Sequence, residues 1–589
     1  MTYDTIIRNA RWFDGTGAPS ALRNIAIRDG RVAAVTPHAL EETGCAEIVD
    51  AAGKWVLPGF VDIHTHYDVE VLDGPGLPES VRHGVTTVLI GSCSLSTVHV
   101  GGTDAGDLFG RVEAIPREHV IDTVDNAKTW TSAHQYIAAL EARPLGPNLA
   151  AFIGHSDMRT ATMGLDRATR SQVKPTAGEM AEMERMLTEA LDAGFLGMSS
   201  QQLLFDKIDG DTCRSRTLPS TYAKPRELRR LKSLLRRRGR VLQSGPDIGN
   251  PLNLLSQLAQ SLPVLRDTLK TSLLSAADVK SNPFAIALLG PLARSVNRFG
   301  ADFRWQHLPV PFEVYADGID LVVFEEFGAG AAALHLRDEV ERNALLQDEG
   351  YRRRFRKDYD SKFGMRVWHR DFFDAEIVEC PDESVIGKSF GQVGVDRGDL
   401  HPVDAFLDLV VEHGRKLRWR TTISNHRPDV LRKLARDDGV QMGFSDAGAH
   451  LRNMAFYNFG LRLLRHVRDA ELRGEPFMTV ERAVHRLTGE LADWYGVDAG
   501  HLRVGDRADL VMIDPRCLDQ RLEDYAESPV PQYANLPRMV NRNDETVELV
   551  LIGGRAVVRD GIPTAVLGAE RTGSFLRAGQ HTEVPAHAC

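Results

Sequence analysis

The stretch Leu57–His66, with the sequence LPGFVDIHTH, decides how the rest of the chain is interpreted. A Pro-Gly pair lies at the start of an apolar run that predicts a β-strand, and this strand ends directly in His-x-His. Residues i and i+2 of an extended chain point to the same side, so we expect His64 and His66 to present their imidazoles together. Two neutral imidazoles at a strand end suit a Zn²⁺ ion. A lone His-x-His is a weak signal, and its place after a strand strengthens it.

Two further strands end in side chains that can bind a metal. Gly84–Cys93 (GVTTVLIGSC) ends in Cys93, whose thiolate is a good zinc ligand, although a buried inert cysteine is the alternative. Met442–His450 (MGFSDAGAH) carries Asp446, which could bind the metal and take a proton from water. A helix N-cap or turn is the alternative role for this aspartate. His450 follows four residues later and is a candidate for substrate contact.

Between the two ends of the chain, strand-like runs alternate with helical stretches. Repeated β-then-α units predict a parallel sheet or barrel, with active-site residues at the C-terminal ends of its strands. The predicted strands are Gly59–Ile63, Thr86–Ile90, Leu149–Ile153, Phe195–Met198, Val241–Leu242, Thr421–Ile423 and Val440–Phe444. The predicted helices include Met180–Ala193, Arg226–Arg238, Asp404–His413, Asp429–Asp437 and Val480–Tyr495.

Both ends of the chain are rich in short β-prone segments separated by turn signals. Examples are Tyr3–Ile7, Asn24–Ile27 and Val547–Ile552. We therefore expect a β-rich module built from both ends. The predicted division is 1–57 for the first part of that module, 58–497 for the barrel with an insertion at about 281–350, and 498–589 for the second part plus a tail.

The composition is that of a soluble globular protein, with 43% hydrophobic and 26% charged residues among 589. The formal net charge of −10 gives no reason to expect nucleic acid as a partner. One strongly basic run, Lys224–Arg240, has leucines at helical spacing. It predicts an amphipathic helix with a solvated basic face, and a patch for an acidic partner is the alternative.

Several features favour a cytoplasmic enzyme. The first residues have no basic segment followed by an apolar run, and no stretch is apolar enough to cross a membrane. The six cysteines are scattered, which favours a reduced compartment. No P-loop motif is present, so nucleotide chemistry has no support. Whether the chain forms a homo-oligomer stays open.

Together these motifs resemble the N-acyl-D-amino-acid deacylases (D-aminoacylases) of the amidohydrolase superfamily. The resemblance is carried by HTHYD and GVTTVLIGSCSLS within Val56–Ser96, and by the later blocks FIGH, GFLGMS, FSDAGAH, VGDRADLV and LIGGR. It implies an α/β fold, a TIM-type (β/α)8 barrel with a small β-sandwich from the N- and C-terminal segments. It also implies that Cys93 is a metal ligand and that His155, in the FIGH block, lines the substrate pocket.

The sequence departs from the family pattern at two metal-binding histidines. Gly245 stands where the first is expected, and Ala276 or Ala277 stands in place of the second. Neither glycine nor alanine can bind a metal. His64, His66 and Asp446 remain, so we expect one Zn²⁺ per chain. His155 and His450 are the predicted substrate contacts. His307, His369 and His426 are further candidates to compensate, with a hydrogen-bonded structural histidine as the alternative for each. Substrate binding is possible for Asp278, Lys280, Glu325 and Glu326, with ordinary surface charge or a structural role as the alternative.

These features predict a hydrolase of a non-peptide C–N bond in a small-molecule amide. The metal activates water, and Asp446 acts as general base and then as general acid. Because two family histidines are missing, the same fold with different chemistry is the first alternative, either cyclic amide hydrolysis or a lyase or isomerase reaction. A degenerate, non-catalytic binding protein is the second alternative.

Overall fold

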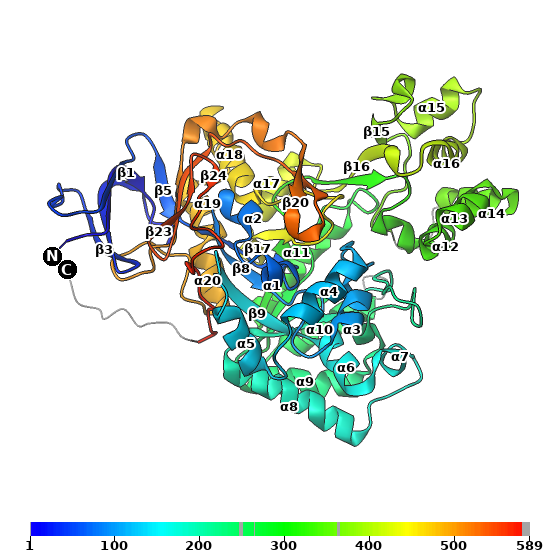
Figure 1. Cartoon of the computed structure of the whole chain (residues 1–589), viewed down its shortest axis with the longest axis horizontal. Helices are drawn as coiled ribbons and strands as arrows, with labels where there is room; N and C mark the ends of the chain where they lie inside the picture. The colour runs from blue at the N-terminus through cyan, green and yellow to red at the C-terminus, as the bar shows by residue number, and fades with distance from the viewer. Residues whose placement is uncertain (1, 247–250, 264–265, 362–365, 580–589) are drawn as a thin grey trace.

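The centre of the molecule is a curled parallel sheet of eight strands (Figure 1). The computed structural model describes the chain except residues 1, 247–250, 264–265, 362–365 and 580–589, so part of the predicted C-terminal tail lies outside the described residues. All neighbouring strands of this sheet run parallel. Their order is β6 (Phe60–Asp62), β8 (Val85–Ile90), β9 (Asn148–Gly154), β10 (Gly197–Gln201), β11 (Val241–Gly245), β12 (Lys270–Leu273), β13 (Asp302–His307) and β17 (Val440–Met442).

The two outer strands of this sheet continue into a second pairing. After β6 comes β7 (His64–Thr65), and after β17 comes β18 (Phe444–Ala447); β7 and β18 are parallel partners. The Ile63 amide donates to the Gly443 carbonyl and the His66 amide to the Ala447 carbonyl, each at 2.7 Å. Residues far apart in the sequence are thereby held beside each other where these strands end.

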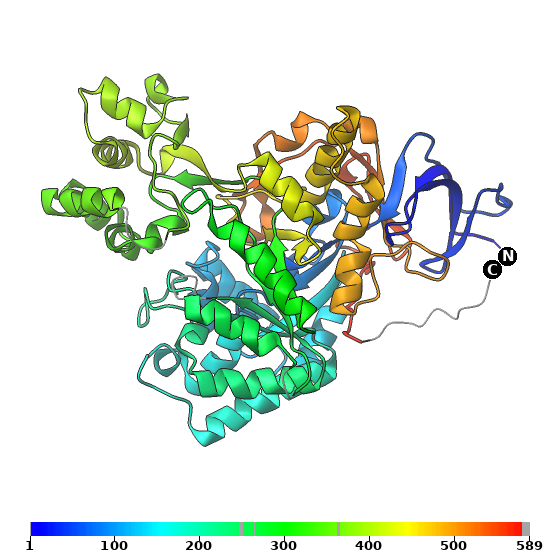
Figure 2. The same ribbon diagram turned by 180° about the vertical axis from the view of Figure 1, so that it is seen from behind.

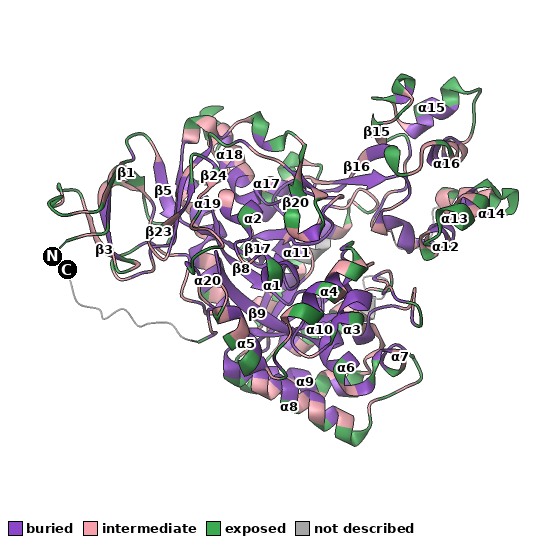
Figure 3. Cartoon of the chain, in the orientation of Figure 1, coloured by how far each residue is buried: buried purple, intermediate pink, exposed green. Residues whose placement is uncertain are grey.

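Helices cover the outside of the sheet, and its strands are buried (Figures 2 and 3). β8 and β9 have no exposed residue, as expected for a parallel sheet covered by helices. The longest helix, α8 (Ala177–Ala193), begins with a capping box of Thr176 and Glu179. Other covering helices are α5 (Ala133–Glu141), α6 (His155–Met163), α9 (Pro225–Arg237), α10 (Pro251–Ser261), α11 (Ala285–Arg298), α17 (Pro428–Arg436), α18 (Phe459–Leu472), α19 (Val480–Leu487) and α20 (Gly489–Tyr495).

Both ends of the chain contribute strands to one nine-stranded sheet, as the sequence predicted (Figure 1). Its apolar interior joins residues from the two ends, such as Ile25 and Leu510. The strands are β1 (Thr5–Trp12), β2 (Ala21–Arg28), β3 (Arg31–Thr36), β4 (Glu47–Asp50), β5 (Trp55–Pro58), β19 (Leu510–Ile513), β22 (Val547–Ile552), β23 (Arg555–Arg559) and β24 (Ile562–Pro563).

A separate lobe projects from the sheet between β13 and β17 (Figure 1). Its own sheet is antiparallel, in the order β14 (Phe312–Asp317), β16 (Arg418–Ser424) and β15 (Glu376–Glu379). The prediction that Thr421–Ile423 is a strand of the central sheet is therefore wrong. Part of the insertion predicted at about 281–350 is β13, which belongs to the central sheet. The lobe helices are α12 (Gly328–His335), α13 (Glu339–Gln347), α14 (Glu349–Asp360), α15 (Phe390–Asp396) and α16 (Pro402–His413).

The helices were also compared with the length and hydropathy of membrane spans. Within the described parts of the chain, none is both long and apolar enough to cross a bilayer.

Candidate metal centre

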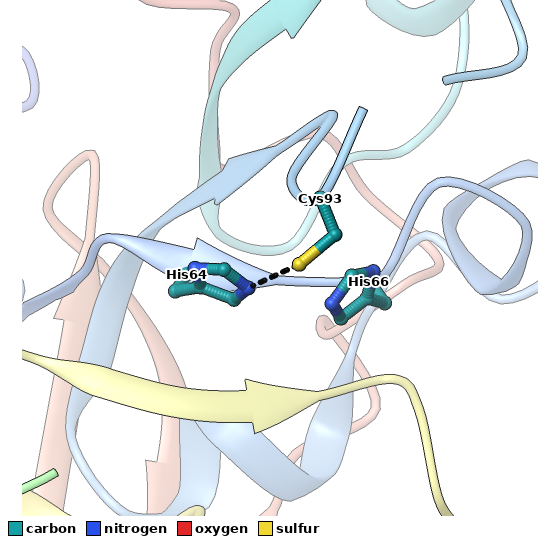
Figure 4. A group of neighbouring side chains, drawn as sticks. All are labelled: His64, His66 and Cys93. Carbon is teal, nitrogen blue, oxygen red and sulfur yellow. Dashed lines mark hydrogen bonds between the residues drawn. The ribbon is translucent and has the colours of Figure 1, made fainter. Parts of the chain in front are cut away.

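Three side chains with metal-binding atoms meet at the C-terminal ends of the first strands (Figure 4). One nitrogen each from His64 and His66 and the sulfur of Cys93 lie within 4.8 Å of one another. The Cys93 Sγ is 3.3 Å from the His64 Nε2. All three residues are buried. Nitrogen and sulfur donors at this spacing fit a zinc-like cation.

Asp446 completes this group from the opposite edge strand. Its Oδ1 lies 3.2 Å from the His66 Nε2 and 3.6 Å from the His64 Nε2. Burial raises the pKa of Asp446, but the neighbouring histidines lower it by more, so that it lies well below its usual range. The carboxylate is therefore ionised. The pairing of β7 with β18 brings these predicted residues together.

Gln306, the next-to-last residue of β13, fixes the orientation of His64. Its Oε1 is 2.7 Å from the His64 Nδ1, and its Nε2 donates to the Ser272 Oγ at 3.0 Å. Because the amide oxygen faces the ring, Nδ1 carries the proton and the Nε2 lone pair points toward Cys93 and Asp446. Burial lowers the pKa of His64 to about 4, which keeps the imidazole neutral.

His66 lies among carboxylates. Its Nδ1 is 3.5 Å from the Glu113 Oε1 and has no hydrogen-bond partner. Burial lowers the pKa of His66, but Glu113 and Asp446 raise it by more, to about 9. Two acidic groups around a buried imidazole attract either a proton or a metal cation. The electrostatics of the site thus agree with its donor set.

The backbone at the site is held in an unusual conformation. Cys93, Ser94, Asp446 and His450 have φ values of 51°, 69°, 61° and 50°. Non-glycine residues seldom adopt this left-handed region, and such strain concentrates at functional sites. Four such residues in one group indicate that the surrounding structure holds these side chains in place.

A cavity of about 470 Å³ opens beside the metal-binding group and is called the substrate cavity below. His66, Cys93 and Asp446 line it, together with the charged residues Glu113, Asp206, Glu326, Arg366 and His450. Most of the other lining residues are apolar and come from both the central sheet and the lobe, among them Leu203, Phe205, Leu274, Phe312, Val314, Val323 and Ile423. A largely apolar cavity with a few converging polar groups is typical of a small-molecule site.

The positions of the two missing histidines lie at this cavity. Gly245 and Ala277 line it, and Ala276 is buried with its amide bonded to the Gln306 carbonyl. A Cβ added to Gly245 would lie 1.6 Å from the Gln201 Oε1. The carboxamide of Gln201 thus takes the space in which a side chain at 245 would start. That Oε1 is buried and has no hydrogen-bond partner among the residues that the structure describes.

The two histidines predicted to contact substrate differ in their surroundings. His450 lines the cavity, 3.8 Å from the Glu113 Oε2, and burial lowers its pKa to about 4. His155 is buried with both ring nitrogens bonded, to the Ser200 Oγ at 3.0 Å and to Glu227 at 2.9 Å. It does not line the cavity. Its predicted substrate contact therefore finds no support in this arrangement.

Among the described residues, the other candidate histidines are not part of the metal-binding group. The His307 Nδ1 is 2.6 Å from the Ala276 carbonyl oxygen. His369 pairs with Asp374 at 2.7 Å, and His426 is 3.9 Å from Asp278. None of the three lines the substrate cavity. The structure does not bring them to the site as replacement ligands.

The charged candidates are mostly held in ion pairs. Asp278 pairs with Arg427, and Lys280 pairs with Asp374. The Arg111 Nε donates to Glu325 at 2.6 Å.

Glu326, by contrast, lines the substrate cavity and accepts the Val367 amide at 3.0 Å. Of these charged candidates, Glu326 alone remains a candidate for contact with substrate.

Four residues at the site were not singled out from the sequence: Glu113, Gln201, Asp206 and Gln306. Gln306 stands next to the candidate His307, but its strand β13 was not predicted from the sequence. Glu113 and Asp206 lie in loops, where a single sequence gives no such signal.

Comparison with known proteins agrees with this geometry. Residues 47–240 match the model of the amidohydrolase family. An uncharacterized protein of Mycobacterium tuberculosis is 57% identical over 98% of this chain and 96% of its own length. An N-acyl-D-glutamate deacylase of Alcaligenes xylosoxydans xylosoxydans is 33% identical over 33% of this chain and 37% of its own length. The crystal structure of N-acyl-D-glutamate deacylase from Bordetella bronchiseptica, complexed with zinc and a phosphonate inhibitor, has the same fold. Its TM-score is 0.64 at 23% identity, with 98% of this chain and all of that chain covered. Residues 47–240 therefore belong to the amidohydrolase family, and the chain is similar to N-acyl-D-amino-acid deacylases.

Proposed function

We propose that this chain hydrolyses the amide bond of a small N-acyl amino acid, in the manner of an N-acyl-D-amino-acid deacylase, with one Zn²⁺ ion. Membership of the amidohydrolase family makes it a hydrolase of carbon–nitrogen bonds other than peptide bonds. One observation carries the finer proposal: His64, His66, Cys93 and Asp446 converge beside one cavity.

We also propose that the central sheet closes as a TIM-type (β/α)8 barrel. The pairing of β7 with β18, which continue the two outer strands, supports this closure. In such barrels the active site lies at the C-terminal ends of the strands, where His64, Cys93 and Asp446 are found. The domain limits 1–57, 58–497 and 498–589 remain part of the proposal.

His64 and His66 would hold the cation, with Asp446 and Cys93 completing or bordering its site. When bound, a divalent cation lowers the pKa of water and polarises an amide carbonyl. Gln306 keeps His64 in the tautomer with a free Nε2 lone pair. The buried Cys93 thiol has a pKa raised well above its usual value, chiefly by burial, so its service as a ligand requires loss of its proton.

Asp446 moves the proton in this proposal. Its ionised Oδ1 faces the same space as the two imidazoles, so it can accept a proton from the attacking water. The same carboxyl group then delivers that proton to the leaving nitrogen. His450 lies on the cavity wall and is placed to contact the substrate.

Asp446→Asn tests this role. We expect a fall in kcat of about 10²–10⁴-fold, because the amide cannot accept the proton. Assays would use a panel of N-acyl-D-amino acids, their L-isomers and cyclic amides.

Asp302→Asn is the matched control, because Asp302 lies at the start of β13 and accepts a hydrogen bond from the Trp494 indole. The control should keep wild-type activity. Wild-type kcat in Asp446→Asn would contradict the assignment.

A second candidate function is a different reaction on the same fold. The observation behind it is the Gln201 carboxamide in the space beside Gly245, where the resemblance to the deacylases predicts a histidine. Turnover of cyclic amides without turnover of acyl amino acids would favour this alternative.

A non-catalytic binding protein is the third candidate. The convergence of His64, His66 and Asp446 argues against it. Unchanged metal content and function in His64→Ala would favour it.

A further inference from the structure

We propose that the chain has a second small-molecule site, which binds a phosphate- or carboxylate-bearing anion in a cavity between α9 and α10. This cavity, of about 470 Å³, is called the basic cavity below. Four cationic residues line it: Arg229, Lys232, Arg236 and Arg266. The amide side chains of Gln202, Asn253, Gln257 and Gln260 also line it, and its described lining includes no acidic residue.

Lys232 is the central observation. It is 3% exposed, and its Nζ donates to the Gln257 Oε1 at 2.7 Å and to the Gln260 Oε1 at 2.9 Å. Both partners are neutral. Burial, with a smaller effect from Arg236, lowers the pKa of Lys232 to about 7. A buried ammonium group without a counter-charge is unfavourable, and a bound anion would compensate it.

Arg236 has a similar position on the same helix. It is 9% exposed and donates to the Gln260 carbonyl at 2.6 Å, while its Nε is buried with no hydrogen-bond partner in the described part of the chain. Burial and the nearby Arg266 lower the pKa of Arg236, whereas Asp267 raises it. A guanidinium group with an unused donor beside a buried lysine is suited to oxygen anions.

Two acidic groups on neighbouring elements are already paired with other cations, and Asp267, which raises the pKa of Arg236, does not line the basic cavity. Glu227 at the start of α9 binds Arg159 and His155. Glu184 of α8 binds Arg230 with two hydrogen bonds of 2.6 Å. Neither lines the basic cavity, so the positive charge there is left for a ligand.

A short segment after β10 separates the basic cavity from the substrate cavity. Gln201, Leu203, Phe205 and Asp206 line the substrate cavity, whereas Gln202 and Leu204 line the basic cavity. The Gln202 Oε1 accepts a hydrogen bond from the Asn253 Nδ2 at 3.0 Å. An anion that rearranges these amides would shift the segment that also forms the wall beside the metal centre. We therefore expect the anion to change KM or kcat of the proposed reaction.

The binding test does not depend on activity. Isothermal titration calorimetry of the full chain would use inorganic phosphate and, separately, succinate, at constant ionic strength. We expect saturable binding of at least one of the two anions. Whether phosphate or succinate binds shows whether the site recognises a phosphate or a carboxylate group. Lys232→Met should weaken it at least about tenfold, the size expected for loss of a charge-assisted hydrogen bond.

Two further variants guard against misfolding and non-specific effects. Arg229 is exposed, so Arg229→Gln should fold normally and still weaken anion binding. Arg238→Gln is the control, since Arg238 is the exposed C-cap residue of the same helix and pairs with Asp192 outside the cavity. No saturable binding of either anion would overturn the proposal. Equal affinity in wild type, Lys232→Met and Arg229→Gln would overturn it as well.

Discussion

Replacing Gln306 by leucine tests whether the central sheet prepares His64 to bind metal. The Gln306 Oε1 lies 2.7 Å from the His64 Nδ1, and both residues are fully buried. Gln306→Leu keeps the approximate volume and removes the acceptor. No water can replace a buried acceptor without space for it, so the Nδ1 proton loses its partner.

The expected loss of zinc affinity follows from the role of Gln306 as the hydrogen-bond partner of His64. Removing a hydrogen-bond partner of a metal-binding histidine weakens metal affinity by about 10- to 100-fold, or about 1.4 to 2.7 kcal/mol. The unpaired buried donor should also lower the free energy of unfolding of the metal-free protein by about 1–3 kcal/mol. Zinc affinity would be measured in competition with a chromophoric chelator, and stability by denaturant unfolding.

Gln441→Leu is the matched control for this experiment. Gln441 is also buried and accepts hydrogen bonds from the Tyr495 hydroxyl at 3.2 Å and the Ser272 hydroxyl at 3.4 Å, but among the described residues it makes no hydrogen bond to His64. It should lose stability and keep its zinc affinity. Zinc affinity of Gln306→Leu within twofold of wild type, or equal losses in both variants, would refute the reasoning.

Three other predictions concern the rest of the site and its support. Gly245→His should destabilise the fold by about 1–3 kcal/mol and add no second zinc, because its Cβ meets the Gln201 Oε1. Adding Gln201→Ala should reverse part of the resulting fall in melting temperature. Cys93→Ser should weaken zinc binding at least about tenfold if the thiolate is a ligand, whereas unchanged affinity would identify an inert buried cysteine. Burial raises the pKa of Glu227, but His155 and other basic neighbours lower it by more, from 4.5 to about 2. The stabilisation of the fold by the ionised Glu227 is therefore complete above pH 4.5 and is lost as the pH falls toward 2. The difference in unfolding free energy between wild type and Glu227→Gln should shrink by up to about 3 kcal/mol over that range. A difference independent of pH, by denaturant unfolding at several pH values, would contradict this assignment.

The candidate metal-binding residues that lie at strand ends could be predicted from the sequence. His64, Cys93 and Asp446 each follow a run of buried apolar residues, and parallel strands place their ends at one edge. Glu113, Asp206 and Gln201 could not be predicted, because their approach depends on loop conformation and on the packing of β10 against β11. The sequence showed that glycine stands at position 245 in place of the expected histidine. It did not show that the Gln201 side chain occupies the space beside Gly245.

The errors in the strand assignment have a physical cause. β12 and β13 have the sequences KTSL and DFRWQH, in which polar residues interrupt the apolar run. Their polar side chains instead form hydrogen bonds in the interior, as Ser272 and Gln306 do. β16, by contrast, alternates the half-buried Arg420 and Thr422 with the buried Trp419, Thr421 and Ile423, which is typical of an antiparallel strand with one partly exposed face.

The most direct test of the central claim is the zinc content of the full chain after removal and replacement of metal, beside that of His66→Ala. We predict one zinc per chain for wild type, held by His64 and His66 with Asp446 and Cys93 nearby, and almost none for the variant. Two zinc ions per wild-type chain, or an equal content in His66→Ala, would contradict the account.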